Sequence, residues 1–462
     1  MNDERLPLHL KLIYGFGDHS VNVALVALSA IFPFYLTDVV EMRVGLAGLV
    51  PLVGRAVDAV TDVWMGRISD HTTWKAGRRR PYFLIGSIPF AVSFAAIWSV
   101  PSIESPAVQF AFYTGVYVML SISMTVVAIP YQALLPELTD SYHERTSLAT
   151  FRSISSILGT FVTLMLFRRL VVELGGDPNA WSLVGAIFGL WIFWPWIPIW
   201  WVTWERPDRQ RESSLSVRES FRLLAENRSF RRLITLYTFG RVAIDLPMSL
   251  FLLYFTYVIG RPTDFEPVMA VFLSAVVLSM PLWLKFSRGR DKRTTYVYGC
   301  TGWVIGLGCL FVNQPEWPFA ITLVATTFAG IGYSAADMLP WSMIADVADE
   351  DEIRSGERRE GLYVGVFTFL RKLAGAVGVA FAFLALDVAG FRPGTQNSDT
   401  VLWVLRAATA LVPVLCVIAS AWAARGYPLG YRRHQEVLEE LERLREKRIL
   451  AAPTDAVIGG PY

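Results

Sequence analysis

The stretch GRISDHTTWKAGRRRP, residues 66–81, is a short basic loop between two apolar blocks, and it decides the fold of this chain. The stretch KFSRGRDKRTTY, residues 285–296, repeats this arrangement in the second half. Each half also carries a charged connection two blocks later, over residues 136–148 and 345–362. A charge plan that recurs with this spacing predicts two related bundles of six helices.

The sequence around these loops is organised in blocks of about 20 apolar residues, the length that an α-helix needs to cross roughly 30 Å of hydrocarbon. Hydrophobic residues make up 53% of the 462 residues and charged residues only 18%, whereas soluble domains carry about 25% charged residues. Lipid offers backbone groups no partner, and the blocks lack the two-residue alternation of a barrel strand, so the spans are helices. Twelve spans are predicted, at residues 12–38, 44–66, 81–100, 107–135, 147–168, 181–203, 233–259, 266–286, 295–314, 318–345, 361–386 and 400–424.

Lys and Arg gather in the connections on the side of the membrane that carries both termini. The opposite side holds few of them: Arg43, Arg168, Arg169, Arg261 and Arg392. Because positive charge is retained in the cytoplasm, both termini are predicted to be cytoplasmic. The predicted parts are an N-terminal bundle (1–203), a cytoplasmic linker with an amphipathic helix (204–232), a C-terminal bundle (233–424) and a cytoplasmic tail (425–462). Residues 434–450 of the tail have the pattern of a charged helix, which we expect to be solvated.

The segment VGRAVDAVTDVWMG, residues 53–66, places charged side chains inside the second span. Asp58 and Asp62 are four residues apart, so both carboxylates project from one helix face about one turn apart. One charge at mid-bilayer costs roughly 2.5–3.5 kcal/mol on the insertion scale, and two like charges on one face cost more. With Thr61 between them, the carboxylates would hold a monovalent cation or share a proton. Alternatively, Arg55 pairs with Asp58, and Asp62 lies near the membrane interface.

Cationic side chains also fall inside later spans. Lys372, in FTFLRKLAGAVGVAF of the eleventh span, is expected to line a transport pathway, unless it snorkels from the first turns of its helix. Arg371 beside it points about 100° away on a helix and therefore needs a different partner. Arg152 lies only a few residues inside the fifth span and is the weaker candidate. Arg241 and Asp245, one turn apart on the seventh span, are expected to neutralise each other.

Several classes of protein are not supported by the sequence. It has no P-loop, no H-E-x-x-H and no strand-turn-helix G-x-S-x-G pattern, so we expect no enzyme. Without a nucleotide site, uphill transport would be driven by an ion gradient. The three cysteines have no metal or disulfide spacing, and the net charge of +2 follows topology rather than a nucleic-acid patch. We expect no cofactor beyond the coupling ion, no nucleic-acid partner and no obligatory protein partner, with the chain acting as a monomer.

The motifs resemble those of the glycoside-pentoside-hexuronide:cation symporters of the major facilitator superfamily. The resemblance rests on these stretches, which span both halves: GRAVDAVTDVWMG, GRRRPYFLIG, IPYQALLPELTDSYHERTSL and SMIADVADEDEIRSGERREGLYVGVFTFLRKLAG. It implies an all-α major facilitator fold and a rocker-switch carrier with a central site between the two bundles. It also implies that Asp58 and Asp62 bind the cation, and that Arg152 and Lys372 lie near the substrate and the cation. The compact loops indicate a bacterial inner membrane.

The substrate positions depart from those of the melibiose permeases in this family. Asn22 and Ala128 replace sugar-binding acids, and Gln132 and Asp337 replace tryptophans that flank the sugar, so melibiose is not expected as the substrate. A neighbouring branch, the sodium-dependent lysophosphatidylcholine transporters, is also similar, through MLPWSMIADV, the lysine of FLRKLAG, and LDVAG. In that branch the lysine is expected to meet the lipid phosphate while the acyl chain follows an apolar cleft.

The sequence therefore predicts a cation-coupled symporter, sodium before proton, that works by alternating access. The substrate is expected to be a lysophospholipid-like amphiphile or a glycoside other than melibiose. The alternatives are a proton-coupled sugar symporter, a passive facilitator and, from another class, a non-transporting receptor or scaffold. The predicted substrate-binding residues are Lys372, Arg152, Asn22, Gln132, Asp337 and Trp341. Charges at the bundle ends are either topology signals or a gate whose ion pairs form when the carrier faces outward: Asp70, Arg78, Arg145, Asp346, Arg358 and Glu360.

Overall fold

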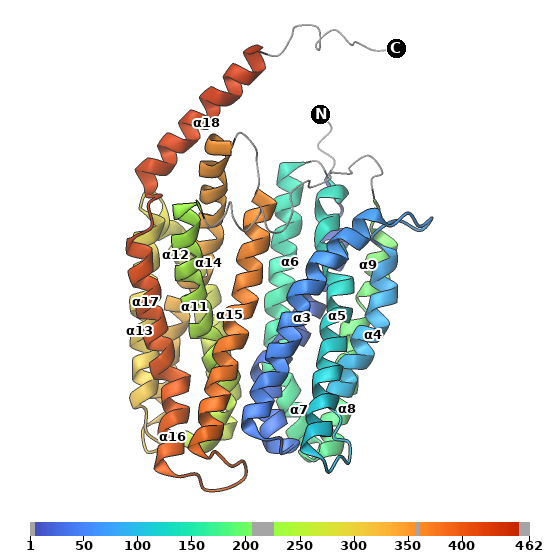
Figure 1. Ribbon diagram of the computed structural model, residues 1–462, viewed down its shortest axis with the longest axis vertical. Coiled ribbons are helices and arrows are strands. Elements are labelled where there is room, and N and C mark those ends of the chain that lie inside the picture. The colour runs from blue at the N-terminus through green and yellow to red at the C-terminus, as the bar shows by residue number, and fades with distance from the viewer. Residues whose placement is uncertain (1–4, 140, 206–225, 356–359, 452–462) are drawn as a thin grey trace.

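The computed structural model describes residues 5–139, 141–205, 226–355 and 360–451, and within these ranges the chain is helical and contains no strand. The long helices run side by side, with the first half of the chain on the right of Figure 1 and the second half on the left. The central stretch 206–225, where the amphipathic linker helix is predicted, lies outside the described residues.

The first half contains six helical passages. The first passage begins with α1 (Leu8–Val26) and continues through a π-helical turn, the short α2 (Phe32–Phe34) and a second π-helical turn to Val39. The others are α3 (Val44–His71), α4 (Pro81–Ile97), α5 (Pro106–Leu138), α6 (Tyr142–Val162) with α7 (Arg168–Glu173), and α8 (Pro178–Phe193) with α9 (Trp196–Val202).

The second half repeats this plan and adds a tail helix. Its passages are α11 (Arg228–Leu253), which a π-helical turn extends to Val258, α12 (Phe265–Ser287), α13 (Lys292–Val312), α14 (Phe319–Ser355), α15 (Glu360–Ala389), and α16 (Asp399–Arg406) with α17 (Val412–Arg425). The tail helix is α18 (Tyr431–Ala451).

Eleven of the described helices are long and apolar enough to cross a membrane, and α4 is a further apolar helix of 17 residues. A helix of 17 residues is about 25 Å long, at the lower limit for a span. The chain is therefore an integral, multi-pass membrane protein. The total of twelve spans and the residue limits of the two bundles remain predictions.

Most of these helices begin and end within several residues of the predicted spans, but α14 is longer than predicted. The apolar block ends at residue 345, whereas the helix continues to Ser355. Asp346 and Glu350 on this extension are buried, and Lys292 and Arg354 pair with them. Hydropathy marks where the hydrocarbon ends, and a helix whose charges are paired can continue past that level.

The helices of each half pack mainly on one another. In the first half, α1 packs on α6, and α4 packs on α5 and α8. In the second half, α14 and α17 both pack on α13, and α11 packs on α17. The two halves meet where α3 packs on α15 and where α2 packs on α11. This arrangement confirms the prediction of two helix bundles.

The two ends of the molecule differ in charge. One end, called the basic end, carries the basic loops 66–81 and 285–296 and the start of α18, and it is uppermost in Figure 1. The other end, called the opposite end, carries the short connections near α7 and α16. Three side-chain pairs join the halves at the opposite end: Arg43 with Asp387, Arg168 with Glu266, and Tyr257 with Asp38. This conformation is therefore sealed at the opposite end.

The contact between α3 and α15 near the opposite end depends on Gly48. A Cβ atom at this position would collide with the Cβ of Phe383 and would lie 3.4 Å from the Cα of Ala380. Both of those atoms belong to the rigid part of α15, so neither can move away by a change of rotamer. A side chain at position 48 would therefore push the two halves apart.

We predict that Gly48→Ala shifts the population away from the conformation sealed at the opposite end. Overpacking costs about 1–3 kcal/mol, which corresponds to roughly 5- to 150-fold in population. The measurement uses Ala380→Cys as a reporter in a chain without its native cysteines, because Ala380 is only 7% exposed against α3. Its labelling by a membrane-impermeant maleimide should accelerate in the Gly48→Ala background. The control is Gly115→Ala, where an added Cβ meets nothing within 4 Å, and equal labelling rates in the two backgrounds would refute the prediction.

Candidate functional site

A single ammonium group on α15 bridges the two carboxylates on α3. Lys372 Nζ donates to Asp58 Oδ2 at 2.7 Å and to Asp62 Oδ2 at 2.6 Å. The Asp58 side chain is 1% exposed, while those of Lys372 and Asp62 are 17% and 23% exposed. Lys372 therefore faces the other half of the molecule and does not snorkel to the interface. The repulsion predicted for the aspartate pair is offset by a charge that comes from the second half.

Thr125 of α5 lies on the other side of the carboxylate pair. Its hydroxyl oxygen is 3.0 Å from Asp58 Oδ1 and 2.9 Å from Asp62 Oδ1. A hydroxyl has one proton and lone pairs, so Thr125 can donate to one carboxylate and can also coordinate a cation held between them. The oxygens of Asp58, Asp62 and Thr125 thus form a set of hard ligands that suits a monovalent cation.

Sequence reasoning missed Thr125, although a signal for it exists. Thr125 lies three residues before Ala128 and seven before Gln132, and this spacing places all three on one helix face. Positions 128 and 132, where this sequence departs from the melibiose permeases, are both predicted to lie on the substrate-facing side of this helix. A hydroxyl on the same face is therefore a candidate from sequence alone, but only the packing of α5 on α3 shows that it meets the acid pair.

Arg55 and Thr61, the other residues expected to interact with the two carboxylates, are less closely associated with them than Lys372 and Thr125 are. Arg55 Nη1 is 4.0 Å from Asp58 Oδ2, so Arg55 is a more distant partner than Lys372. Thr61 donates its hydroxyl to the carbonyl oxygens of Val57 and Asp58, at 3.1 and 3.2 Å. The Thr61 proton is thus satisfied by its own helix, and a role as an ion ligand remains a prediction.

A second charged pair lies near the first. Arg241 Nη2 is 2.5 Å from Asp245 Oδ1, which confirms the prediction that these two residues neutralise each other. The Arg55 side chain is 20% exposed, and it lies within electrostatic reach of both. The facing surfaces of the halves therefore share a cluster of three acids and three bases whose charges cancel: Asp58, Asp62, Asp245, Arg55, Arg241 and Lys372.

Aromatic side chains surround Arg371 in the second half. The Arg371 guanidinium carbon lies 5.9 Å from the centre of the Trp341 ring, and Trp341 is 38% exposed. The rings of Tyr237 and Phe367 stack with centroids 4.1 Å apart, and Phe367 also meets Trp341 at 5.3 Å. Arg371 and Lys372 thus have different surroundings, as their positions on the helix predict.

The remaining predicted substrate residues are distributed over both halves. Arg152 Nη2 donates to Asp18 Oδ1 at 3.2 Å, and its guanidinium carbon lies 4.9 Å from the centre of the Tyr131 ring. Asn22 donates to the Asp18 carbonyl at 3.0 Å, the Gln132 side chain is exposed, and Asp337 is partly buried. Arg152 is therefore the ion-pair partner of Asp18, and the acid pair on α3 uses Lys372. Contact of these residues with a substrate remains a prediction.

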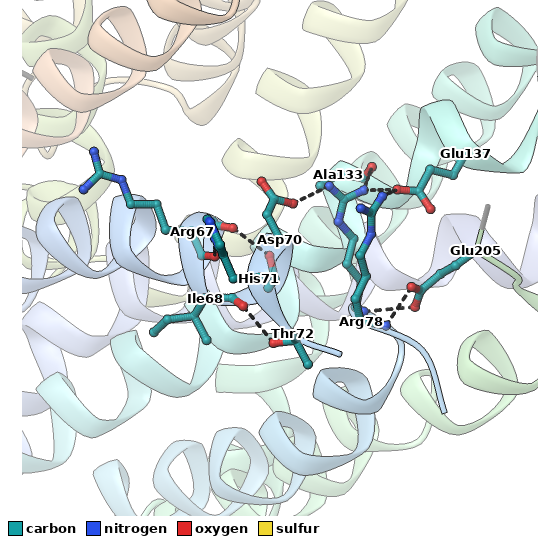
Figure 2. A network of polar contacts seen from close by, with 12 residues as sticks. Arg67, Ile68, Asp70, His71, Thr72, Arg78, Ala133, Glu137 and Glu205 are labelled. Atoms are coloured by element: carbon teal, nitrogen blue, oxygen red, sulfur yellow. Dashed lines mark hydrogen bonds and ion pairs between the residues drawn. The ribbon is translucent and has the colours of Figure 1, made fainter. Parts of the chain in front are cut away.

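The basic loop of the first half is held by a network that contains two of the predicted gate residues (Figure 2). Arg79 Nη2 donates to Asp70 Oδ1 at 2.6 Å, and Arg79 Nη1 donates to the carbonyl of Ala133 at 2.6 Å. The side chains of Arg78 and Arg79 both contact the buried Glu137 of α5. These contacts join α3, the loop and α5 within one half.

The Glu205 carboxylate anchors the same loop from the end of the sixth passage. It accepts hydrogen bonds from the backbone N–H groups of residues 78–80 at 2.8–2.9 Å. Three consecutive donors that converge on one carboxylate form an anion site made of backbone. The arginine run thus has a fixed backbone as well as fixed side chains.

In the second half, the Asp346 carboxylate of α14 contacts basic side chains of α13 and of α18. Lys292 Nζ is 2.7 Å from Asp346 Oδ2, and His434 Nε2 of α18 is 3.4 Å from Asp346 Oδ1.

The predicted gate also includes Arg145, Arg358 and Glu360. Arg145, in the first half, donates through Nε to the Thr139 carbonyl at 2.9 Å. Arg358 lies outside the described residues, and Glu360 begins α15 but its side chain is not described. Ion pairs between the halves at the basic end therefore remain a prediction.

Comparison with known proteins shows which family shares this arrangement. The profile of the family described as MFS/sugar transport protein matches residues 13–431. An uncharacterised symporter of Synechocystis, sll1374, is 27% identical over 96% of this chain and 98% of its own. The sodium-dependent lysophosphatidylcholine symporter 1 of Gallus gallus is 27% identical over 98% of this chain and 92% of its own. The inner membrane symporter YicJ of Escherichia coli is 27% identical over 96% of each chain.

Solved structures show the same fold at low sequence identity. A bacterial homologue of the human lysosomal transporter Spinster aligns with a TM-score of 0.66 at 15% identity, over 94% of this chain and 97% of its own. A D-xylose-proton symporter aligns with a TM-score of 0.63 at 14% identity, over 91% and 99%. These matches confirm the major facilitator fold implied by the sequence motifs. The chain belongs to the MFS/sugar transport protein family, and it is a membrane transporter rather than an enzyme.

Proposed function

We propose that this chain is a cation-coupled symporter, with sodium as the preferred ion, and that Asp58, Asp62 and Thr125 bind the ion. Lys372 couples ion binding to substrate binding in this proposal. The observation that carries it is the single ammonium group that bridges both carboxylates from the other half. The relatives named as symporters, one of them sodium-dependent, support the same assignment.

The Lys372 ammonium has the charge and the oxygen partners that a monovalent cation would have at this position. Its Nζ lies within 2.7 Å of one oxygen from each carboxylate. Two cations cannot occupy the space between these oxygens together, so an incoming sodium ion must displace the ammonium group. Ion binding therefore releases Lys372 for another partner.

The charges around the site indicate which kind of partner the released Lys372 would take. The cluster of three acids and three bases is neutral, and one bound sodium ion leaves one positive charge in excess between the halves. An unpaired charge in a site of low dielectric is strongly unfavourable. A substrate that places an anionic group beside Lys372 pairs the released ammonium group, so the loaded carrier closes readily only when ion and substrate are both bound. This charge requirement is a direct mechanism for symport.

The substrate that fits best is a lysophospholipid-like amphiphile, whose phosphate would pair with the released Lys372. The aromatic rings near Arg371 provide a surface for its apolar parts. The Gallus gallus relative, a lysophosphatidylcholine symporter by name, supports this class. The exposed amide of Gln132 and the polar side chain of Asn22 favour a second class, a glycoside that carries a carboxylate.

Alternating access would use the two ends in turn. The three side-chain pairs at the opposite end would separate, and the predicted gate at the basic end would close through these residues: Asp70, Arg78, Arg145, Asp346, Arg358 and Glu360. The positive-inside rule places the basic end in the cytoplasm. The E. coli relative is named an inner membrane symporter, which supports a bacterial inner membrane for this chain. The chain would act as a monomer.

We predict that Lys372→Met strengthens sodium binding. Loss of one partner from a buried ion pair costs about 3–5 kcal/mol, so the variant should be less stable than the wild type without sodium. Sodium should then restore stability with an apparent affinity at least about tenfold higher, because its competitor is gone. Thermal unfolding in detergent, with sodium or choline chloride, measures both effects. The matched control is Arg371→Met, because Arg371 faces Trp341, and an unchanged sodium affinity in Lys372→Met would rule out competition.

We also predict that Asp58→Asn and Asp62→Asn abolish sodium-driven uptake in proteoliposomes while the purified protein remains folded. Each variant removes one of the two charges that the ion needs. Uptake of labelled lysophosphatidylcholine and of a glycoside panel, with sodium or proton gradients, is the measurement. Asp399→Asn is the control, because Asp399 is exposed at the start of α16. Uphill uptake by either site variant would contradict the assignment of Asp58 and Asp62 as the ion site. Uptake without any ion dependence would indicate a facilitator.

A third prediction tests Thr125 separately from the aspartates. Thr125→Val removes the hydroxyl at nearly constant volume, whereas Thr125→Ser keeps it. Sodium affinity from thermal unfolding should fall in the valine variant and stay near the wild-type value in the serine variant. If both variants bind sodium like the wild type, Thr125 only packs between the carboxylates and is not a ligand.

A further inference from the structure

We propose that the loop between α12 and α13, together with the start of α18, binds the phosphate group of an anionic membrane lipid. Two adjoining cavities lie here at the basic end, with volumes of about 390 and 450 Å³, and they share Gly289, Gly430 and Tyr431 in their walls. Sites for small molecules usually have about 300–1,000 Å³. This site lies in the second half, outside the charged cluster that faces the other half, and it is independent of the transport proposal.

The walls of the two cavities are strongly basic. Six Lys or Arg side chains line them against two carboxylates, and the full set is Arg288, Arg290, Lys292, Arg293, Arg432, Arg433, Asp291 and Asp346. Such an excess attracts an anion and does not suit a cation or a neutral sugar.

Some of these cations are neutralised by the protein, and others are not. Lys292 pairs with Asp346 at 2.7 Å, Arg293 contacts Asp291 at 3.3 Å, and Arg433 contacts Glu436 at 2.8 Å. In the described part of the chain, no carboxylate pairs with the remaining three guanidinium groups, those of Arg288, Arg290 and Arg432. These three are the groups available to a ligand.

Arg290 is already held in place by its neighbours. Its Nη1 donates to the carbonyl of Phe286 at 2.9 Å, and its guanidinium carbon lies 4.5 Å from the centre of the Phe286 ring. This arrangement limits the freedom of a long side chain before any ligand arrives. A guanidinium group held in this way loses less entropy when it binds a phosphate.

The α18 wall of the site is fixed to the bundle, which corrects the prediction of a solvated tail helix. The backbone N–H of Tyr431 donates to Asp291 Oδ1 at 2.5 Å, and the Val437 and Leu441 side chains are 0% and 3% exposed. The helix packs on α14 and leaves the bundle from the basic end in Figure 1. Arg432 is thus carried on a docked element and lies opposite the α12–α13 loop.

The depth of the site along α12 matches the lipid headgroup layer. Leu278 and Leu282 are 73% and 67% exposed, and their spacing places them on one lipid-facing side of α12. Arg288 comes six residues after Leu282, which is about 9 Å further along the helix axis. Tyr431 is 48% exposed, as is common for tyrosine at the membrane interface. A lipid whose chains lie along these leucines would therefore bring its phosphate to Arg288.

Guanidinium groups bind phosphate through paired hydrogen bonds, and basic pockets at the positive side of a membrane protein recognise anionic headgroups. Soluble phosphate esters carry the same group, but the exposed leucines next to the site favour a ligand with acyl chains. The assigned ligand class is therefore a lipid with a net negative phosphate headgroup.

The test measures the thermal stability of the purified full-length protein in detergent during titration with dioleoylphosphatidylglycerol. We expect the lipid to stabilise the wild-type protein in a saturable way. The double variant Arg288→Gln/Arg432→Gln should need an about tenfold higher lipid concentration to reach the same stabilisation. The matched control is Arg67→Gln/Lys75→Gln, which removes two exposed basic side chains of the same end that do not line the cavities. The control should titrate like the wild type.

Parallel titrations use dioleoylphosphatidylcholine and sn-glycerol 3-phosphate. Stabilisation by the phosphatidylglycerol alone supports the proposal. Equal stabilisation by phosphatidylcholine would show that the headgroup charge is irrelevant, and equal stabilisation by glycerol phosphate would show a soluble anion site; either result overturns the assignment. The proposal is also overturned if the Arg288/Arg432 and Arg67/Lys75 double variants weaken the lipid effect equally, because that result indicates general attraction to the basic end.

Discussion

Two carboxylates on one face of a membrane-embedded helix must have a counter-charge, and in this protein the counter-charge comes from the other half of the molecule. Lys372 reaches both Asp58 and Asp62, so electrostatic neutrality at the centre of the bilayer and the relative position of the halves depend on the same contact. Separation of this contact would leave charges unpaired unless another cation took the place of the ammonium group. The constraint on charge is thus also a constraint on motion.

The other intramembrane charges follow a different rule. Arg152 pairs with Asp18 inside the first half, and Arg241 pairs with Asp245 inside the second half. Pairs of this kind lie within one bundle and do not join the two halves. The three pairs that join the halves at the opposite end must separate when that end opens. The described ion pairs therefore fall into two groups, those that lie within one bundle and those that join the two bundles.

Much of this could be predicted because local pattern determines it. Apolar length predicted the helices, and helix geometry predicted both the Arg241–Asp245 pair and the divergence of Arg371 from Lys372. Predictions were weaker where the partner lies far away in sequence. The acid pair was expected to need a cation, but its contact with Thr125, 67 residues from Asp58, depends on the packing of α5 on α3. The tail helix was predicted as a helix, whereas its docking depends on contacts with α14.

Local sequence pattern is sufficient to show that the chain spans the membrane many times, that its halves share one charge plan and that two acids lie on one helix face. These features follow from hydropathy and from the fixed angle between residues of a helix. The packing of the helices is needed to show which cation meets those acids, that Arg152 pairs with Asp18, and that the tail helix lines a basic cavity beside the α12–α13 loop. Each of these depends on how separate helices pack, and the periodicity of a single helix contains no information about its neighbour.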